Sequence, residues 1–308
     1  MAFSKLQNPM TRPQLADLMY PGLHKAYIDY FEHYPEEYTK FLNVESSTKR
    51  QEEDLVMEGF GLIPEKTEGD TPIYDVLAIS DKLQYLHKTY VLGYEASEEL
   101  IEDELYSVLS KASGLLAKSV KLTCDTLGAA VLNNAFSASY LGVDGKALCA
   151  TDHPQAKISG GTVANRPTTE TDFDPVALQA ALLTWEQWED ANGIPMLYTP
   201  KYVISGPAQR DIITRTLGST QYPGTNDNDI NSIRTWELEK MILHYLTDDD
   251  AWFIMAPLGD TFLKWFWRVK PAFRGWDDPE TGNARYTVRF RASCGFTHWP
   301  GIWGTTGI

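Results

Sequence analysis

The chain has 308 residues, 43% of them hydrophobic, so it is long enough to bury a sizeable core. Its 42 acidic and 27 basic side chains give a formal net charge of -15. This charge argues against tight, nonspecific binding of nucleic acid or anionic lipid over most of the surface, although it does not exclude local basic patches.

The three cysteines lie far apart and lack the spacing of a zinc site or of a disulfide framework, which favours a reducing cytoplasm. No charged and then apolar leader opens the chain. No apolar run approaches the roughly 20 residues of a membrane helix. We therefore expect neither export nor a membrane partner.

The first 47 residues contain helical pieces interrupted by prolines and are rich in tyrosine and phenylalanine. We expect this N-terminal arm to dock its aromatic side chains either on a neighbouring chain or on its own domain. Because the arm itself occupies the start of the chain, we expect any protein that assists assembly to be a separate chain.

Residues 48–94 alternate charged runs and β-prone runs with glycine and proline breaks. This pattern predicts an extended β-hairpin loop and its base. An isolated hairpin is marginally stable in water. We therefore expect Phe60, Leu62 and Ile63 to be covered by an adjacent subunit.

The clearest helical pattern begins at Ser97, a candidate N-cap, and continues to about residue 136, with possible bends at Gly114 and Gly128. Its first turns carry a cluster of acidic residues: Glu98, Glu99, Glu102, Asp103 and Glu104. Like charges at this density repel, so the pattern predicts basic side chains nearby, with Lys49 and Arg50 as candidates.

A second helix is predicted after Asp174 and Pro175, ending at Asn192-Gly193. A strand at 201–205 and a helix from 209 to about 217 follow, and the polar stretch at 218–232 is expected to be an exposed loop. The remaining segments are rich in β-branched and aromatic residues and predict antiparallel strands. The whole pattern is α+β.

The stretch GKALCATDHP, at 145–154, contains neighbouring acid and base groups in Asp152 and His153. Adjacent residues of an extended chain point to opposite faces, so any partner of His153 must come from elsewhere. We interpret the stretch as a loop in which Asp152 caps local N–H groups and Pro154 fixes the backbone. A hydrolase that uses His153 is a distant alternative.

The other histidines lack metal-ligand spacing, and the acidic run at 226–232 lacks the glycine and the glutamate of a calcium loop. Sequence motifs of nucleotide-binding loops, zinc proteases and serine hydrolases are absent. We therefore expect no cofactor, no metal and no catalytic residue.

Three stretches are informative through their order in the chain. They are GKALCATDHP followed by Gly160-Gly161 and Asn165, then GIPMLYTPKYVISGPAQRDIITRTLGS at 193–219, then RYTVRFRASCGFTHWPGIWGTTG at 285–307. Together they resemble the major capsid protein family of tailed bacteriophages. Trp299-Pro300-Gly301 stands where that family often has Trp-Arg-Gly. The resemblance covers roughly residues 46–307.

The resemblance implies the tailed-phage major capsid fold. Its parts would be an N-terminal arm (1–47), an extended hairpin loop with its base (48–94) and a peripheral domain with a long spine helix (95–205). A mainly axial domain (206–284) and the closing strand of the peripheral domain (285–308) would follow. In that family the arm and the hairpin reach across neighbouring subunits.

The implied function is structural: a subunit that assembles into pentameric and hexameric capsomers of an icosahedral shell around double-stranded DNA. Implied partners are further copies of the chain, a portal protein, scaffolding or decoration proteins, and packaged DNA held nonspecifically on the inner face. The location would be the virion capsid, assembled in the host bacterial cytoplasm. An encapsulin-like protein nanocompartment of the same fold is the alternative.

Some members of the family join their shells by a covalent bond between a hairpin lysine and an asparagine of a neighbour, assisted by a carboxylate. Lys66 and Asn283 match the first two participants. No aspartate or glutamate occurs from residue 285 to residue 308. We therefore expect a shell held by noncovalent contacts, with a carboxylate from Asp277, Asp278 or Glu280 as the alternative.

Overall fold

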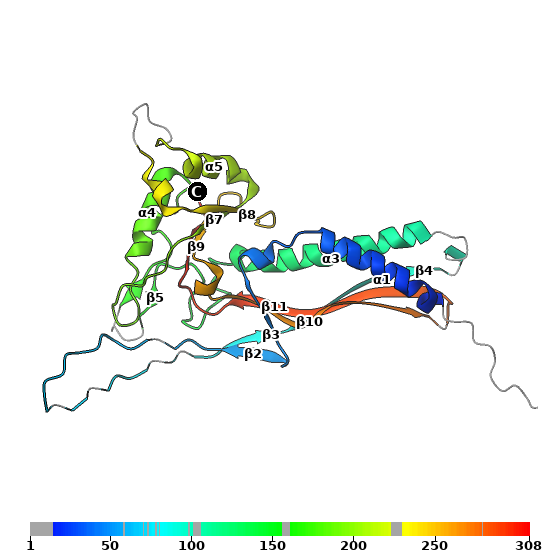
Figure 1. Cartoon of the computed structure of the whole chain (residues 1–308), viewed down its shortest axis with the longest axis horizontal. Coiled ribbons are helices and arrows are strands. Elements are labelled where there is room, and N and C mark those ends of the chain that lie inside the picture. The colour runs from blue at the N-terminus through cyan, green and yellow to red at the C-terminus, as the bar shows by residue number, and fades with distance from the viewer. Residues whose placement is uncertain are drawn as a thin grey trace, which may run out of the picture. The chain divides into compact units, whose positions relative to one another are not determined.

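Figure 1 shows a computed structural model of the chain, which describes residues 15–57, 59–69, 71–72, 74–77, 79, 81–97, 99–100, 106–155, 161–222, 230–278 and 280–308. The chain forms two compact units. Unit 1 comprises Met1–Glu36, His87–Asp125 and Trp267–Ser293, and unit 2 comprises Glu37–Leu86, Thr126–Phe266 and Cys294–Ile308. None of the helices in the described ranges has the length and apolarity that a bilayer crossing needs.

The chain contains both helices and strands. The α-helices are α1 (Leu15–His33), α3 (Tyr106–Asn133), α4 (Pro175–Glu186) and α5 (Arg210–Gly218). Short 3-10 helices are η1 (Tyr38–Lys40), η2 (Pro207–Gln209), η3 (Ser232–Trp236) and η4 (Leu258–Asp260). The mixture agrees with the predicted α+β class.

Two four-stranded sheets organise the strands. The first has the order β1 (Asn43–Ser46), β10 (Leu263–Asp277), β11 (Ala284–Phe296) and β4 (Lys88–Ala96). The second has the order β12 (Ile302–Thr305), β9 (Trp252–Met255), β7 (Tyr202–Ser205) and β8 (Glu239–Ile242). Two strand pairs complete the set: β2 (Gln51–Asp54) with β3 (Leu83–Leu86), and β5 (His153–Pro154) with β6 (Thr162–Val163).

Unit 1 is built on one aromatic face of its strands. Tyr286 of β11 lies opposite Tyr94 of β4 and stacks on Phe273 of β10, with ring centroids 5.8 Å apart. Tyr27 of α1 also stacks on Phe273, and the Tyr94 hydroxyl lies 2.7 Å from the Ser113 hydroxyl of α3. Helices α1 and α3 therefore cover this face (Figure 1).

The proline in α1 does not break the helix, which corrects the prediction of interrupted helical pieces. Pro21 lies inside α1, where it removes one backbone donor and strains the preceding turn. Contacts on both sides of it hold the helix in place. Tyr20 donates a hydrogen bond to the Phe273 carbonyl at 2.9 Å, and Leu23 and Tyr27 are buried. These aromatic side chains of the predicted arm thus pack on their own unit.

Helix α3 is the longest of the described helices, with 28 residues. The predicted cap at Ser97 is confirmed, because Ser97 Oγ accepts a hydrogen bond from Leu100 N at 3.3 Å. Helix α3 itself begins at Tyr106. Residues 98 and 101–105 lie outside the described residues, and α3 ends at Asn133, slightly before the predicted end. Its two glycines make room for rings: a Cβ at Gly114 would lie 2.7 Å from Tyr30, and one at Gly128 would lie 2.6 Å from Tyr38.

Unit 2 has a tryptophan-rich core around the second sheet, with Trp185, Trp188, Trp252, Trp299 and Trp303 buried together. The predicted cap of α4 is confirmed, because the Asp174 carboxylate accepts from Ala177 N at 2.6 Å. The helix ends at Glu186, six residues before the predicted stop. Trp188 then donates a hydrogen bond to the Ala164 carbonyl, an interaction outside the helix.

One expectation for the region after β7 is wrong. Strand β8 pairs with β7 in parallel, not antiparallel, because α5 carries the chain back to the same end of the sheet. The described residues of the predicted loop at 218–232 are exposed or half-buried apart from Asn231, which caps η3 and donates to the Thr216 and Ser219 carbonyls. Residues 223–229 of that loop lie outside the described residues.

The close approach at Gly128 predicts an effect opposite to helix propensity. Alanine is the better helix former by about 1 kcal/mol, but its methyl group would collide with the buried Tyr38. We expect Gly128→Ala to lower the free energy of unfolding by about 1–2 kcal/mol in thermal or urea denaturation. The control Gly218→Ala has no neighbouring atom within 4 Å and should not destabilise. Equal stability of the Gly128→Ala and wild-type chains would contradict this packing.

Candidate subunit interface

The hairpin that follows β2 exposes large apolar side chains. The exposed fractions of Phe60, Leu62 and Ile63 are 62%, 81% and 96%. Further exposed apolar side chains in the same segment are Met57, Tyr74, Val76 and Ile79. A soluble monomer seldom keeps an apolar patch of this kind, so the segment has the character of a protein-binding surface.

The base of the hairpin, in contrast, is fixed by buried polar contacts. The Asp54 carboxylate lies 2.5 Å from Lys264 Nζ and accepts a hydrogen bond from the Thr297 hydroxyl at 2.6 Å. The buried Tyr85 hydroxyl lies 2.8 Å from the same Thr297 oxygen. Burial alone would raise the pKa of Asp54, but the Lys264 and Thr297 contacts outweigh it and the pKa is lowered. The carboxylate therefore stays ionised and holds the stem.

Further out, the two arms of the hairpin are joined through Asp75. Its carboxylate accepts hydrogen bonds from Gly61 N at 2.9 Å and from Val76 N at 2.7 Å. Asn192 of the α4–β7 connection donates to the Gly59 carbonyl at 3.1 Å. The predicted two-stranded excursion is confirmed by the antiparallel pairing of β2 with β3 and by the bridge between Met57 and Ile79.

The charged residues nominated for the interface have separate environments. Lys49 is exposed and lies 3.6 Å from Glu52 of its own chain. Arg50, Lys66 and Glu99 are also exposed. Glu98 and Glu102 lie outside the described residues.

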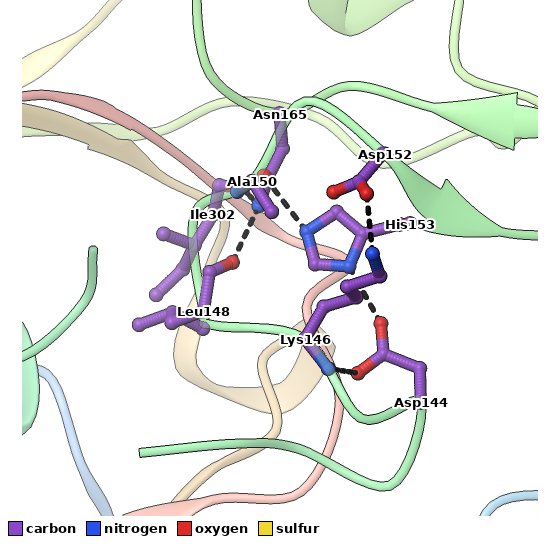
Figure 2. Close-up of polar contacts among 8 residues, drawn as sticks. All are labelled: Asp144, Lys146, Leu148, Ala150, Asp152, His153, Asn165 and Ile302. Carbon is purple, nitrogen blue, oxygen red and sulfur yellow. Dashed lines mark hydrogen bonds and ion pairs between the residues drawn. The ribbon is translucent and has the colours of Figure 1, made fainter. Parts of the chain in front are cut away.

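His153 and Asn165 are fully buried and form the centre of a polar cluster (Figure 2). Its Nδ1 is 2.6 Å from Asp144 Oδ2, and its Nε2 is 3.0 Å from Asn165 Oδ1. The imidazole ring also stacks on Trp299, with ring centroids 4.8 Å apart. A histidine with both nitrogens engaged and its ring face covered has no free position from which to attack a substrate.

Asn165 is held in one orientation by its hydrogen bonds. Asn165 Nδ2 donates to the carbonyls of Leu148 and Ile302, at 2.8 and 2.9 Å, and its Oδ1 accepts from Ala150 N at 2.8 Å. Each nitrogen of the His153 ring therefore faces an oxygen, Nε2 the Asn165 amide oxygen and Nδ1 the Asp144 carboxylate. Burial alone would raise the pKa of Asp144, but His153 outweighs it and the pKa is lowered.

The interpretation of this stretch as a structural loop agrees with the geometry, but the role given to Asp152 is wrong. Asp152 forms an exposed ion pair with Lys146 instead of capping local N–H groups. The true partner of His153, Asp144, lies nine residues away and was not identified from the sequence. In the sequence, Asp144 is marked only by its position before Gly145. Gly145 has a φ of 71°, at which the chain reverses direction.

A carboxylate beside Asn283 was also missed. Asn283 Nδ2 donates to Glu95 Oε1 of β4 at 2.7 Å, and Arg285 Nε lies 3.2 Å from the other oxygen of Glu95. These hydrogen bonds lower the pKa of Glu95. Because β4 and β11 are far apart in sequence, the spacing around Asn283 could not reveal this neighbour. In the described ranges, no group of three His, Cys, Asp or Glu side chains could hold a metal ion.

The comparisons with known proteins decide the family. A family model described as phage capsid protein matches residues 81–304, well over half of the chain. The chain belongs to this phage capsid protein family. No curated protein matches the chain.

Solved structures share the fold of this capsid protein at low sequence identity. The procapsid of bacteriophage JBD30 is 17% identical, with a TM-score of 0.56, over 97% of this chain and 77% of that chain. A structure of Microbacterium phage Oxtober96 is 11% identical, with a TM-score of 0.54, over 100% and 96%. A virus-like particle from Pyrococcus furiosus is 11% identical, with a TM-score of 0.52, over 93% and 98%.

The capsid protein is therefore a structural subunit of a virion shell and not an enzyme. The prediction from the ordered sequence stretches is confirmed, and the hydrolase alternative for His153 is excluded. The nanocompartment alternative is not favoured, because the family that matches is a phage capsid family. A shell subunit acts by self-association, so the exposed hairpin is the foremost candidate for a contact with another copy.

The contacts of His153 predict that the carboxylate of Asp144 stabilises the fold, whereas the carboxylate of the adjacent Asp152 contributes little. Asp144→Asn replaces the carboxylate that faces the buried His153 ring with a neutral amide, which should lower the free energy of unfolding by about 1–3 kcal/mol. Asp152→Asn removes only an exposed ion pair and should change it by less than about 1 kcal/mol. Thermal denaturation of the unassembled subunits measures both. Equal losses in the two variants would contradict the assignment of partners.

Proposed function

We propose that this capsid protein assembles into pentameric and hexameric capsomers of an icosahedral shell that encloses double-stranded DNA. Assembly would take place in the host bacterial cytoplasm. The division into arm, hairpin, peripheral domain, axial domain and closing strand, with the boundaries given above, is part of this proposal. In it, the hairpin of each subunit lies on an adjacent subunit.

The observation that carries the proposal is the contrast within the hairpin. Its base is anchored by Asp54, Lys264 and Thr297, whereas Leu62 and Ile63 are almost fully exposed. Burying one such side chain stabilises a contact by about 1.5–3 kcal/mol, and a shell repeats the contact in every subunit. An anchored base keeps the apolar end extended and ready to bind, which lowers the entropic cost of association.

Charged contacts are proposed to accompany the apolar one. The exposed Lys49 and Arg50 would face the acidic start of the spine helix of a neighbour, at Glu98, Glu99 and Glu102. A portal protein, scaffolding or decoration proteins and nonspecifically held DNA complete the proposed partners. The JBD30 capsid, which shares the fold at 12% identity and a TM-score of 0.54, is decorated with minor capsid protein trimers, which supports a decorated shell.

The hairpin contact is tested by placing charge on its apolar end. We expect the double variant Leu62→Asp, Ile63→Asp to give folded subunits that do not close shells in electron microscopy, because charged side chains cannot be buried on a neighbour. Thr67→Asp adds a charge to the same exposed segment without removing apolar surface, and it serves as the control. Normal shells from the double variant would refute the proposed role of the hairpin.

The shell is proposed to be held by noncovalent contacts. A lysine is a poor nucleophile while it is protonated, and it needs a free base nearby. Glu95 lies beside Asn283, but the hydrogen bonds from Asn283 and Arg285 that lower its pKa make it a poor proton acceptor. Lys66 would therefore stay charged next to it.

A denaturing gel tests this expectation. Particles boiled in detergent should give a single band near the 34.7 kDa monomer. The variant Lys66→Arg, which keeps the charge but cannot form the amide, should give the same pattern. A ladder of multimers that disappears in Lys66→Arg would show that a covalent bond forms through Lys66 and would refute the noncovalent shell.

A further inference from the structure

The exposed side of α3 carries a regular row of apolar and basic side chains. The exposed fractions of Val108, Leu115 and Leu122 are 47%, 66% and 38%. Lys111 and Lys118 lie between them in the helix. Successive members of this row are three or four residues apart, so the five side chains follow one line along the helix. We call these five residues the α3 stripe; all of them belong to unit 1.

The other sides of α3 are covered by unit 1 itself. The Ser113 hydroxyl contacts Tyr94 of β4, and Tyr30 of α1 lies against Gly114. Figure 1 shows α1 running along α3. Leu109 is buried, as are Leu116, Ala117 and Val120. Packing within the unit therefore accounts for these apolar residues but not for the α3 stripe.

The stripe is also positively charged. Within the part of the chain that the structure describes, no carboxylate pairs with either of its two lysines. Lys121, on the side toward α1, does pair with Glu36 and is buried. The described helix α3 contains a single acidic residue, Asp125, which is buried. The exposed side of α3 is thus basic in a chain with a net charge of -15.

Apolar residues at this spacing allow a second helix to pack lengthwise against the first. Such a helix needs apolar side chains opposite Val108, Leu115 and Leu122. It also needs acidic side chains opposite the two lysines, because a charge that is covered without a partner is costly. Ala112 and Ser119 follow the lysines in the sequence, and their small side chains leave room for a close approach.

Two other occupants match the stripe less well. Nucleic acid would pair its phosphates with the lysines but would leave the most exposed side chain, Leu115, without apolar cover. A second α3 stripe would bring four lysines together, and like charges repel. An acidic helix satisfies both the apolar and the basic members.

We propose that the α3 stripe binds an acidic amphipathic helix of another protein, packed along α3. The inference rests on the proposed function, in which other proteins accompany the shell subunit, and it describes the chemistry of one such contact. Lysine at two of the five contact positions makes the contact weak in a single subunit. A partner that presents several such helices gains strength from the many copies of the stripe in a shell.

A designed peptide tests the contact on the full-length, unassembled subunit. The acidic probe is a synthetic helix of about three heptads, with leucine at the first and glutamate at the fourth position of each heptad, and alanine and glutamine elsewhere. Fluorescence anisotropy of the labelled probe should give a Kd of about 10–100 µM. The variant Leu115→Gln removes exposed apolar surface and should weaken binding about tenfold.

A charge swap tests the electrostatic part. The variant Lys111→Glu, Lys118→Glu should bind the acidic probe about tenfold or more weakly. It should regain affinity for a second probe in which lysine replaces each glutamate, because the charges are again complementary. Both variants change partly or fully exposed side chains, so the melting temperature of the subunit should stay close to that of the wild type.

Leu183→Gln on α4 is the matched control, because Leu183 is a helical leucine of unit 2 with an exposed fraction of 57%. The control should bind the acidic probe like the wild type. The inference is overturned if the wild type does not bind this probe, if the control loses as much affinity as Leu115→Gln, or if the second probe restores nothing. Binding of a DNA duplex in place of the probe, lost only in the lysine variant, would instead make the stripe a nucleic-acid site.

This outcome is separable from the test of the proposed function, because the probe is measured on subunits that have not assembled. If Leu62→Asp, Ile63→Asp closes normal shells while the probe binds the stripe, the proposed role of the hairpin fails and this inference stands. If that variant blocks closure and the probe does not bind, the role of the hairpin stands and this inference fails.

Discussion

The hairpin tip, residues 57–79, carries apolar side chains that the described part of the chain leaves uncovered, and assembly depends on this constraint. Leu62 and Ile63 are almost entirely in contact with solvent, which is unfavourable in proportion to the area exposed. Covering them by a second copy turns this cost into a driving force for association. Self-association of this kind is consistent with membership of a capsid family.

Polar contacts hold two segments without long helices or strands, the stem of the hairpin and the 142–154 loop, in defined positions. Asp54, held by Lys264 and Thr297, sets the stem of the hairpin. His153 and Asn165 join the 142–154 loop to the carbonyl of Ile302 in β12. Buried charged networks of this kind contribute little net stability but strongly penalise any rearrangement that leaves one partner behind. In unit 2, these contacts hold the stem of the hairpin and the 142–154 loop in place.

Local features were predictable from the sequence, because their causes lie within a few residues. The caps at Ser97 and Asp174 and the long apolar stripe of α3 follow from nearest-neighbour chemistry. The two-stranded hairpin was likewise visible in its glycine and proline breaks. The order of three stretches then indicated the family, although none of them is specific alone.

Features that depend on distant segments were missed. The partner of His153, the carboxylate beside Asn283 and the parallel pairing of β8 all join segments whose proximity only the fold reveals. Pro21 remains in a helix because packing against Phe273 outweighs its local strain.

In the proposed shell, the hairpin tip is exposed in the free subunit and buried in the assembled particle. Amide hydrogen exchange of residues 57–79, measured on unassembled subunits and on purified particles, tests this burial most directly. We expect rapid exchange in the subunit and strong protection in the particle, with little change at the buried strands β7 and β9. Equally rapid exchange of the tip in both states would show that no neighbour covers the hairpin.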